Sequence, residues 1–101
     1  MDVALSLKGL IEEFHALLEA QDFEGAEELL SQALGHQEPK REAYLHFQLG
    51  RLYLQWNKTT SAVNHFTKGA ELAHQHAEEI LLLQITEELK LARRRQASQR
   101  P

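Results

Sequence analysis

Residues 44–73 constrain the fold of this chain more than any other stretch, because they are typical of two amphipathic helices joined by a short turn. Small residues occur where two such helices would cross, at Gly50, Ala62 and Gly69, and large aromatic residues flank them, at Tyr53 and Phe66. Antiparallel helices approach closely only where side chains are small, and large side chains then fill the space beside the crossing. The pattern therefore predicts a tightly packed helical hairpin.

The same pattern occurs once more, 36 residues earlier in the chain. When residues 20–34 are shifted forward by 36, apolar positions meet apolar positions: Ala26 falls on Ala62, Leu30 on Phe66 and Ala33 on Gly69. Upstream, Leu17 falls on Tyr53 and Leu18 on Leu54. The earlier copy has a bulky Phe14 where the later one has Gly50, which predicts a wider helix crossing in the first hairpin.

Residues 44–73 resemble a tetratricopeptide repeat. The resemblance rests on an aromatic or apolar residue followed by Leu49-Gly50, Tyr53, Ala62, Phe66 and Gly69. The resemblance covers residues 7–95. It implies an all-α fold, a right-handed superhelix of two antiparallel helix pairs plus a capping helix, five helices in total. It also implies a module that binds other proteins and has no chemistry of its own. A generic four- or five-helix bundle would satisfy the same apolar pattern.

The apolar periodicity predicts helices over residues 3–20, 23–34, 39–56, 60–73 and 77–95. Asp22 is expected to cap the second helix, and Thr59 or Thr60 the fourth. Gly35 and Pro39 separate the second helix from the third. Residues 1–95 are therefore expected to form a single helical domain, and residues 96–101 a flexible polar tail.

Charge and cysteine content narrow the classes of function. Residues 1–38 hold nine acidic residues and one basic residue, which argues against nucleic acid as the main partner. The chain has no cysteine, which fits a reducing compartment, and it has no apolar run long enough for a signal peptide or a membrane span. We expect a cytoplasmic protein.

The polar residues do not form a recognisable catalytic or metal site. His74 and His76 are two residues apart, so on a helix they point in nearly opposite directions and cannot share a metal. Adjacent glutamates likewise diverge, and there is no phosphate-binding glycine loop. The dipole of a helix C-terminus explains the basic run Arg93-Arg94-Arg95. Binding to an anionic surface or to nucleic acid is the less favoured interpretation of this run. We expect no enzyme activity, no metal and no cofactor.

In the tetratricopeptide family the first helix of each pair lines a concave groove that holds a peptide or helix. Mapped onto this chain, the groove is expected to be apolar, to begin near Lys8 and to end near Leu81 and Ile85. Its partner-binding face is expected to consist of Ile11, His15, Leu18, Tyr44, Phe47, Arg51 and Leu54. Phe47 and Leu54 could instead belong to the core. The lysine and asparagine residues with which some family members hold the carboxylate of heat-shock chaperones are absent.

The predicted fifth helix is more apolar than a cap requires. Its projection places Ile80, Leu83 and Leu91 on the face opposite the one that should pack on the fourth helix. Three large aliphatic residues on an outer face suggest an oligomer interface, for example of a homodimer. The sequence thus leaves two functions open: a small adaptor or chaperone-like scaffold that binds a protein or peptide in a groove, and a self-assembling helical structural protein.

Overall fold

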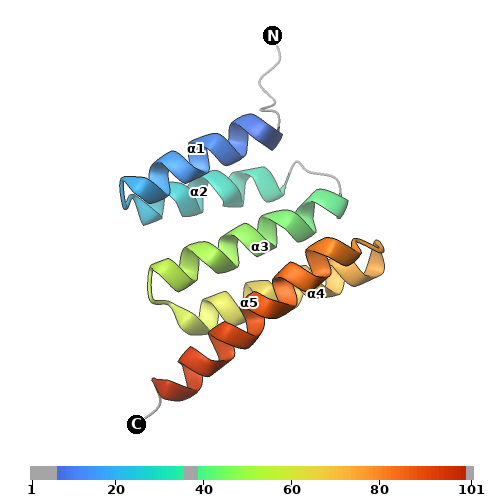
Figure 1. The fold of residues 1–101 in the computed structure, drawn as a ribbon. Coiled ribbons are helices and arrows are strands. Elements are labelled where there is room, and N and C mark those ends of the chain that lie inside the picture. The colour runs from blue at the N-terminus through green and yellow to red at the C-terminus, as the bar shows by residue number, and fades with distance from the viewer. Residues whose placement is uncertain (1–6, 36–38, 100–101) are drawn as a thin grey trace.

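The computed structural model of the chain describes residues 7–35 and 39–99, and over these ranges it is entirely helical (Figure 1). Its helices are α1 (Leu7–Glu19), α2 (Phe23–Leu34), α3 (Pro39–Gln55), α4 (Thr59–Gln75) and α5 (Glu79–Ser98). The prediction of an all-α fold with five helices is confirmed. Residues 3–6, which the sequence assigned to the first helix, lie outside the described residues.

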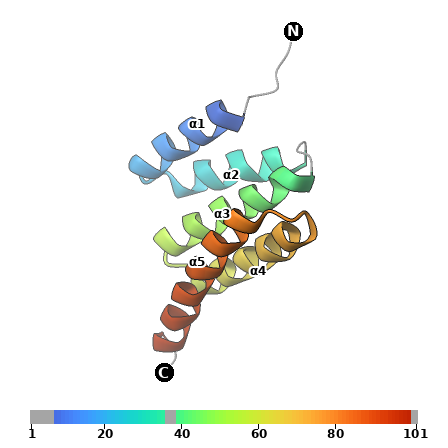
Figure 2. The same cartoon turned by 45° about the vertical axis from the view of Figure 1, so that its right-hand side comes forward.

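Each helix packs mainly on its neighbours in the chain, so the molecule is a stack that runs from α1 to α5 (Figures 1 and 2). The contact between α3 and α4 is the most extensive, followed by that between α4 and α5. The contacts of α2 with α1 and with α3 are much smaller, and α5 also touches α3. The result is an elongated body of 52 × 34 × 18 Å.

The crossing of α3 and α4 has the close approach that the small residues predicted. A Cβ atom added to Gly50 would lie only 2.5 Å from the Phe66 ring, so the ring occupies the space that a side chain would need. Gly69 is also at a close approach but a less severe one, because its Cβ would lie 3.2 Å from the carbonyl oxygen of Ala43 and 3.3 Å from Ile85. Gly50 was expected to lie against Ala62 or Phe66 at this crossing, and the structure places it against Phe66.

Three similar turns join the helices. Gln21, Asn57 and Ala77 each adopt a positive φ, between 57° and 61°. In each turn the residue after the one with positive φ donates its N–H to the carbonyl oxygen five residues earlier, as Asp22 does to Leu17 and Lys58 to Tyr53, both at 2.8 Å. This pattern of hydrogen bonds closes the C-terminus of a helix. Gln21 and Asn57 are 36 residues apart, so the repeat seen in the sequence has a structural counterpart in its turns.

Several helix ends differ from those predicted. Asp22 caps α2 as expected, accepting a hydrogen bond from the Gly25 N–H at 3.0 Å. The N-cap of α4 is Lys58, which makes no side-chain capping bond, so the expected cap at Thr59 or Thr60 is wrong. In the preceding turn the Lys58 N–H donates to the backbone carbonyl of Tyr53. Helical geometry consequently begins at Thr59, which is buried.

The last two helices extend further at their C-terminal ends than the polar residues there indicated. The fourth helix runs on to Gln75, through residues assigned to a turn, and α5 begins at Glu79 and continues to Ser98, beyond the predicted end at 95. The extension of α5 is tied back to the rest of the fold, since Gln96 donates to Thr60 at 3.2 Å and Gln99 donates to Asn57 at 3.0 Å.

One cluster of buried apolar side chains runs through the whole stack, from Leu10 in α1 to Ala92 in α5. Phe14, Leu30 and Phe66 are among its largest fully buried members. Within the described ranges, no helix has the length and apolar character that crossing a membrane requires.

Candidate functional site

A hollow between α1 and α3 brings together polar side chains from both helices, and three residues of its lining were predicted from the sequence. Its lining is His15, Leu18 and Glu19 from α1 and Gln48, Arg51 and Gln55 from α3. Its volume is about 300 Å³. On each helix the lining residues are three or four positions apart, so they lie on one face. The hollow exists because α1 packs on α2 and leaves this face of α3 open.

Gln48 lies at the base of the hollow and is only 2% exposed. Its Oε1 atom is buried and has no hydrogen-bond partner among the described residues. A buried polar atom without a partner costs free energy, about 1–3 kcal/mol when it is fully removed from water. An amide in this position is therefore a group that a bound molecule could satisfy.

Arg51 provides a positive charge at the mouth of the hollow. Its guanidinium carbon lies 5.7 Å from the centre of the Phe47 ring, in the range of a cation–π contact, and the side chain is exposed. The contact with Phe47 orients the guanidinium and leaves its N–H groups available to an acceptor. Across the hollow, the His15 ring lies 5.8 Å from the ring of the buried Phe14.

The predicted groove residues fall into three groups. His15, Leu18 and Arg51 line the hollow together, and Ile11 and Tyr44 are half-buried. Phe47 and Leu54 are only 7% and 8% exposed and share a core cluster with Ile85, so they follow the alternative that the sequence left open for them.

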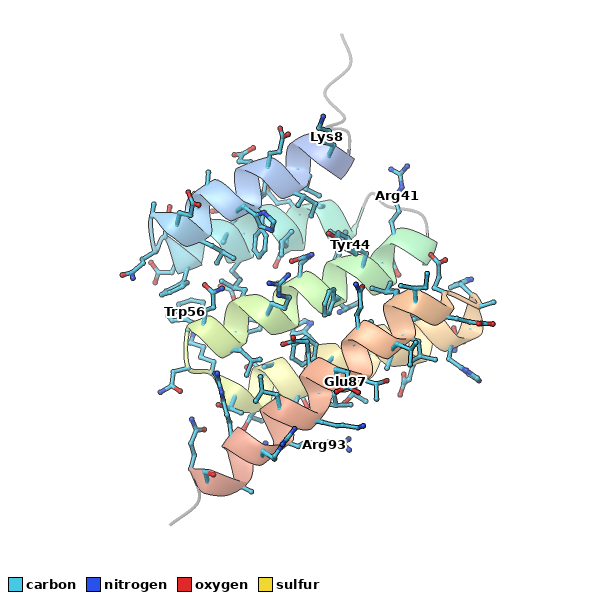
Figure 3. All side chains as sticks on the ribbon, in the orientation of Figure 1. Lys8, Arg41, Tyr44, Trp56, Glu87 and Arg93 are labelled. Carbon is cyan, nitrogen blue, oxygen red and sulfur yellow. The ribbon has the colours of Figure 1, made fainter. Side chains whose placement is uncertain are left out.

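The burial of these side chains changes the character of the surface. α5 packs beside α3 and α4 and joins their core, and the apolar residues of that face are covered as a result. The residues that line the remaining hollow are mostly polar, with Leu18 as the apolar one, and the aliphatic parts of the polar side chains add apolar surface, whereas a groove of apolar residues was expected. Lys8 is exposed at the start of α1 (Figure 3).

Sequence reasoning missed three lining residues, Glu19, Gln48 and Gln55. The signal for two of them was present, since Gln48, Arg51 and Gln55 are spaced by three and four positions and must share a face of α3. Apolar positions were predicted as peptide anchors, and the amide side chains were not.

A second polar cluster joins α2, α3 and α4 inside the fold. The Tyr53 hydroxyl donates a hydrogen bond to the Glu27 carboxylate, and the Tyr53 ring stacks on His65 with 5.3 Å between ring centres. The Nδ1 atoms of His65 and His46 are 3.0 Å apart, so one ring donates and the other accepts. The imidazole that accepts must be neutral at this nitrogen.

The ionisation of these groups reflects their surroundings. Burial, together with the hydrogen bond to Glu27, raises the pKa of Tyr53 to about 12. Burial and the neighbouring His65 and Lys68 lower the pKa of His46 to about 4. Burial also lowers the pKa of His65, against the opposing effect of the Glu27 carboxylate. The cluster is half-buried and links α2, α3 and α4 through side-chain contacts.

No group of three His, Asp or Glu side chains within residues 7–35 and 39–99 is arranged to hold a metal ion. No protein-family model, curated protein or solved structure gives a significant match to the chain. The resemblance to tetratricopeptide repeats therefore stays a prediction that rests on the residues quoted for it.

Proposed function

We propose that this protein is a non-enzymatic interaction module that binds a segment of a partner protein in the hollow between α1 and α3. The observation that supports the proposal best is the unpartnered Oε1 atom of Gln48 at the base of the hollow, beside the exposed Arg51 guanidinium. An extended peptide presents backbone N–H groups that can donate to such an oxygen. The absence of cysteine leads us to propose further that the protein acts in the cytoplasm.

The lining specifies the chemistry of the bound segment. Arg51 offers a fork of N–H donors that suits a carboxylate or a backbone carbonyl. Leu18 offers a single apolar contact, and His15 and Gln55 at the rim can donate or accept. We therefore expect a polar segment with one acidic side chain and one aliphatic side chain, and not the strongly amphipathic helix that an apolar groove would select.

Selection from a library of displayed random peptides tests the proposal. Peptides selected on the parent protein should bind the Arg51→Glu variant at least tenfold more weakly, because a repelling charge replaces the donor fork. Gln48→Leu should also weaken them, and it should leave the thermal midpoint of the free protein unchanged or raised, because it removes an unpartnered buried atom.

Lys68→Glu is the matched control, since Lys68 is exposed on α4 and does not line the hollow. This variant should bind the selected peptides as the parent does. Failure to select any peptide, or peptides that ignore both Arg51→Glu and Gln48→Leu, would show that the hollow is not a binding site.

A further inference from the structure

The outer face of α5 carries an apolar strip that no part of the described chain covers. Ile80, Leu83 and Leu91 are 76%, 67% and 39% exposed, and within residues 7–35 and 39–99 they are the large apolar side chains that are most exposed. Projected along the helix, they fall on one side, with Glu87 between Leu83 and Leu91. Figure 3 shows Glu87 midway along α5 and Arg93 towards its C-terminal end.

Charge is divided unevenly along the same helix. The first half of α5 carries Glu79, Glu87 and Glu88 and no basic residue, and the second half carries Lys90, Arg93, Arg94 and Arg95 and no acidic residue. Lys90 lies 3.5 Å from the Glu87 carboxylate. The three arginines make no ion pair with any described residue, so their charges remain available to another molecule.

We propose that α5 pairs with α5 of a second copy of this chain, with the two helices antiparallel. A two-fold axis near Glu87 sets Leu83 of one copy opposite Leu91 of the other, and each Ile80 against the aliphatic part of an arginine side chain. The antiparallel direction brings Arg94 and Arg95 near the end of each helix towards Glu79 of the other, and the two Glu87 side chains meet near the axis, each paired with Lys90 of its own helix. A parallel pair would instead place seven charges of each copy beside like charges.

The size of the strip determines the strength of this pairing. α5 has 20 residues, and a helix of that length spans about 30 Å. One face of a single helix is smaller than the ~800 Å² per partner of a standard stable interface. The dimer is therefore weak, with a dissociation constant in the micromolar range or above, and it forms as the protein concentration rises.

Sedimentation equilibrium of the full chain between about 10 µM and 1 mM measures the association. The average mass should rise from 11.6 kDa towards twice that value, and 0.5 M NaCl should weaken the association severalfold because it screens the charge pairs. Leu83→Lys should weaken it more than tenfold, as should the gentler Leu83→Gln, while Asn64→Lys on the exposed surface of α4 should leave it unchanged.

A parent protein that stays monomeric at 1 mM overturns the proposal and leaves the strip to a different protein. A dimer that is insensitive to Leu83→Lys and Leu83→Gln also overturns it, because the contact then lies on another face. Circular dichroism shows whether the variants keep their fold. If they do not, the direction of pairing can still be tested by cross-linking other variants that carry a cysteine at an exposed position.

The chain has no cysteine, so a single introduced cysteine reports one position. When Leu83→Cys and Leu91→Cys proteins of different tag mass are mixed and oxidised, the mixed disulfide should exceed both symmetrical ones, and Glu87→Cys should cross-link to itself. Symmetrical disulfides for Leu83→Cys and Leu91→Cys, with little mixed product, would establish a parallel pair and refute the antiparallel arrangement.

Discussion

Replacing Gly50 with alanine tests the packing of the α3–α4 crossing directly. The new Cβ would lie 2.5 Å from two carbon atoms of the Phe66 ring and 2.8 Å from a third. Carbon atoms in contact prefer about 3.5–4.0 Å, so the ring would have to move by roughly 1 Å. Phe66 is fully buried and its ring centre lies 6.1 Å from that of Phe47, which leaves it little room to move.

The size of the effect follows from two opposing terms. Overpacking a well-filled core costs about 1–3 kcal/mol. Alanine regains about 1 kcal/mol over glycine through its helix propensity. Because an approach of 2.5 Å places the overpacking cost in the upper part of that range, about 2–3 kcal/mol, we expect Gly50→Ala to lose about 1–2 kcal/mol of unfolding free energy, which for a domain of this size lowers the thermal midpoint by about 4–16 °C.

Thermal melts followed by circular dichroism measure the effect against two glycines in different surroundings. A Cβ at Gly69 would lie 3.2–3.3 Å from its nearest neighbours, and one at Gly35 would come no closer than 3.9 Å to any other group. Gly69→Ala should therefore change the midpoint little, and Gly35→Ala should leave it unchanged or slightly raised, since alanine restricts the unfolded chain. A Gly50→Ala protein that melts with or above the Gly35→Ala protein refutes the reasoning.

A double-mutant cycle identifies the clash partner. Phe66→Leu shortens the side chain that meets the new Cβ, so in that background Gly50→Ala should cost about 1 kcal/mol less than it costs in the parent. Additive effects of the two substitutions would mean that Gly50 is constrained by something other than the Phe66 ring.

Three further predictions concern the polar cluster and the turns. The folded-state pKa of His46 is about 4 and that of His65 is also lowered, so the unfolded chain binds more protons than the folded protein below pH 6.5. The free energy of unfolding should therefore fall as the pH drops from about 6.5 towards 4, by about 1–2 kcal/mol once solvent screening at these half-buried rings is allowed for. Urea titrations at each pH would measure this loss. Tyr53→Phe removes the hydrogen bond to Glu27 and should cost about 1 kcal/mol in urea unfolding at pH 7. Ala77→Gly relieves a positive φ of 57° and should raise the thermal midpoint by a few degrees, corresponding to about 0.5–1 kcal/mol.

Each of these three predictions has a matched control. His74→Asn alters an exposed imidazole and should leave the pH dependence intact, whereas His46→Asn should flatten it. Tyr44→Phe removes a hydroxyl that has no hydrogen bond to a described residue, and it should be nearly neutral. Ala97→Gly, within the last turn of α5, should destabilise the protein where Ala77→Gly stabilises it. A reversed order within any pair contradicts the corresponding prediction.

The sequence predicted the parts of the fold that depend on local pattern and size. Apolar periodicity located all five helices, and the pairing of Gly50 with Phe66 followed from the need for a small residue at a close crossing. The end of α4 at Gln75 could not be predicted in this way, because polar residues on the outer face of a helix look the same as those of a turn.

The candidate site was harder to predict, because it depends on which faces other helices cover. Phe47 and Leu54 have the spacing of a groove-lining face, but nothing in their own helix reveals that they share a core with α5. His46 and His65 are 19 residues apart, and they meet only because the α3–α4 hairpin aligns them.

The one-after-another packing of the helices has a consequence for how the molecule opens. α1 is held mainly by α2, and α2 has small contacts on both sides, whereas α3, α4 and α5 hold one another closely. Cooperativity in such a stack weakens from one helix to the next. Backbone amides of α1 and α2 should thus exchange with solvent in partial openings that leave the α3–α5 unit intact, and the hollow, which needs both α1 and α3, would come apart in the same event.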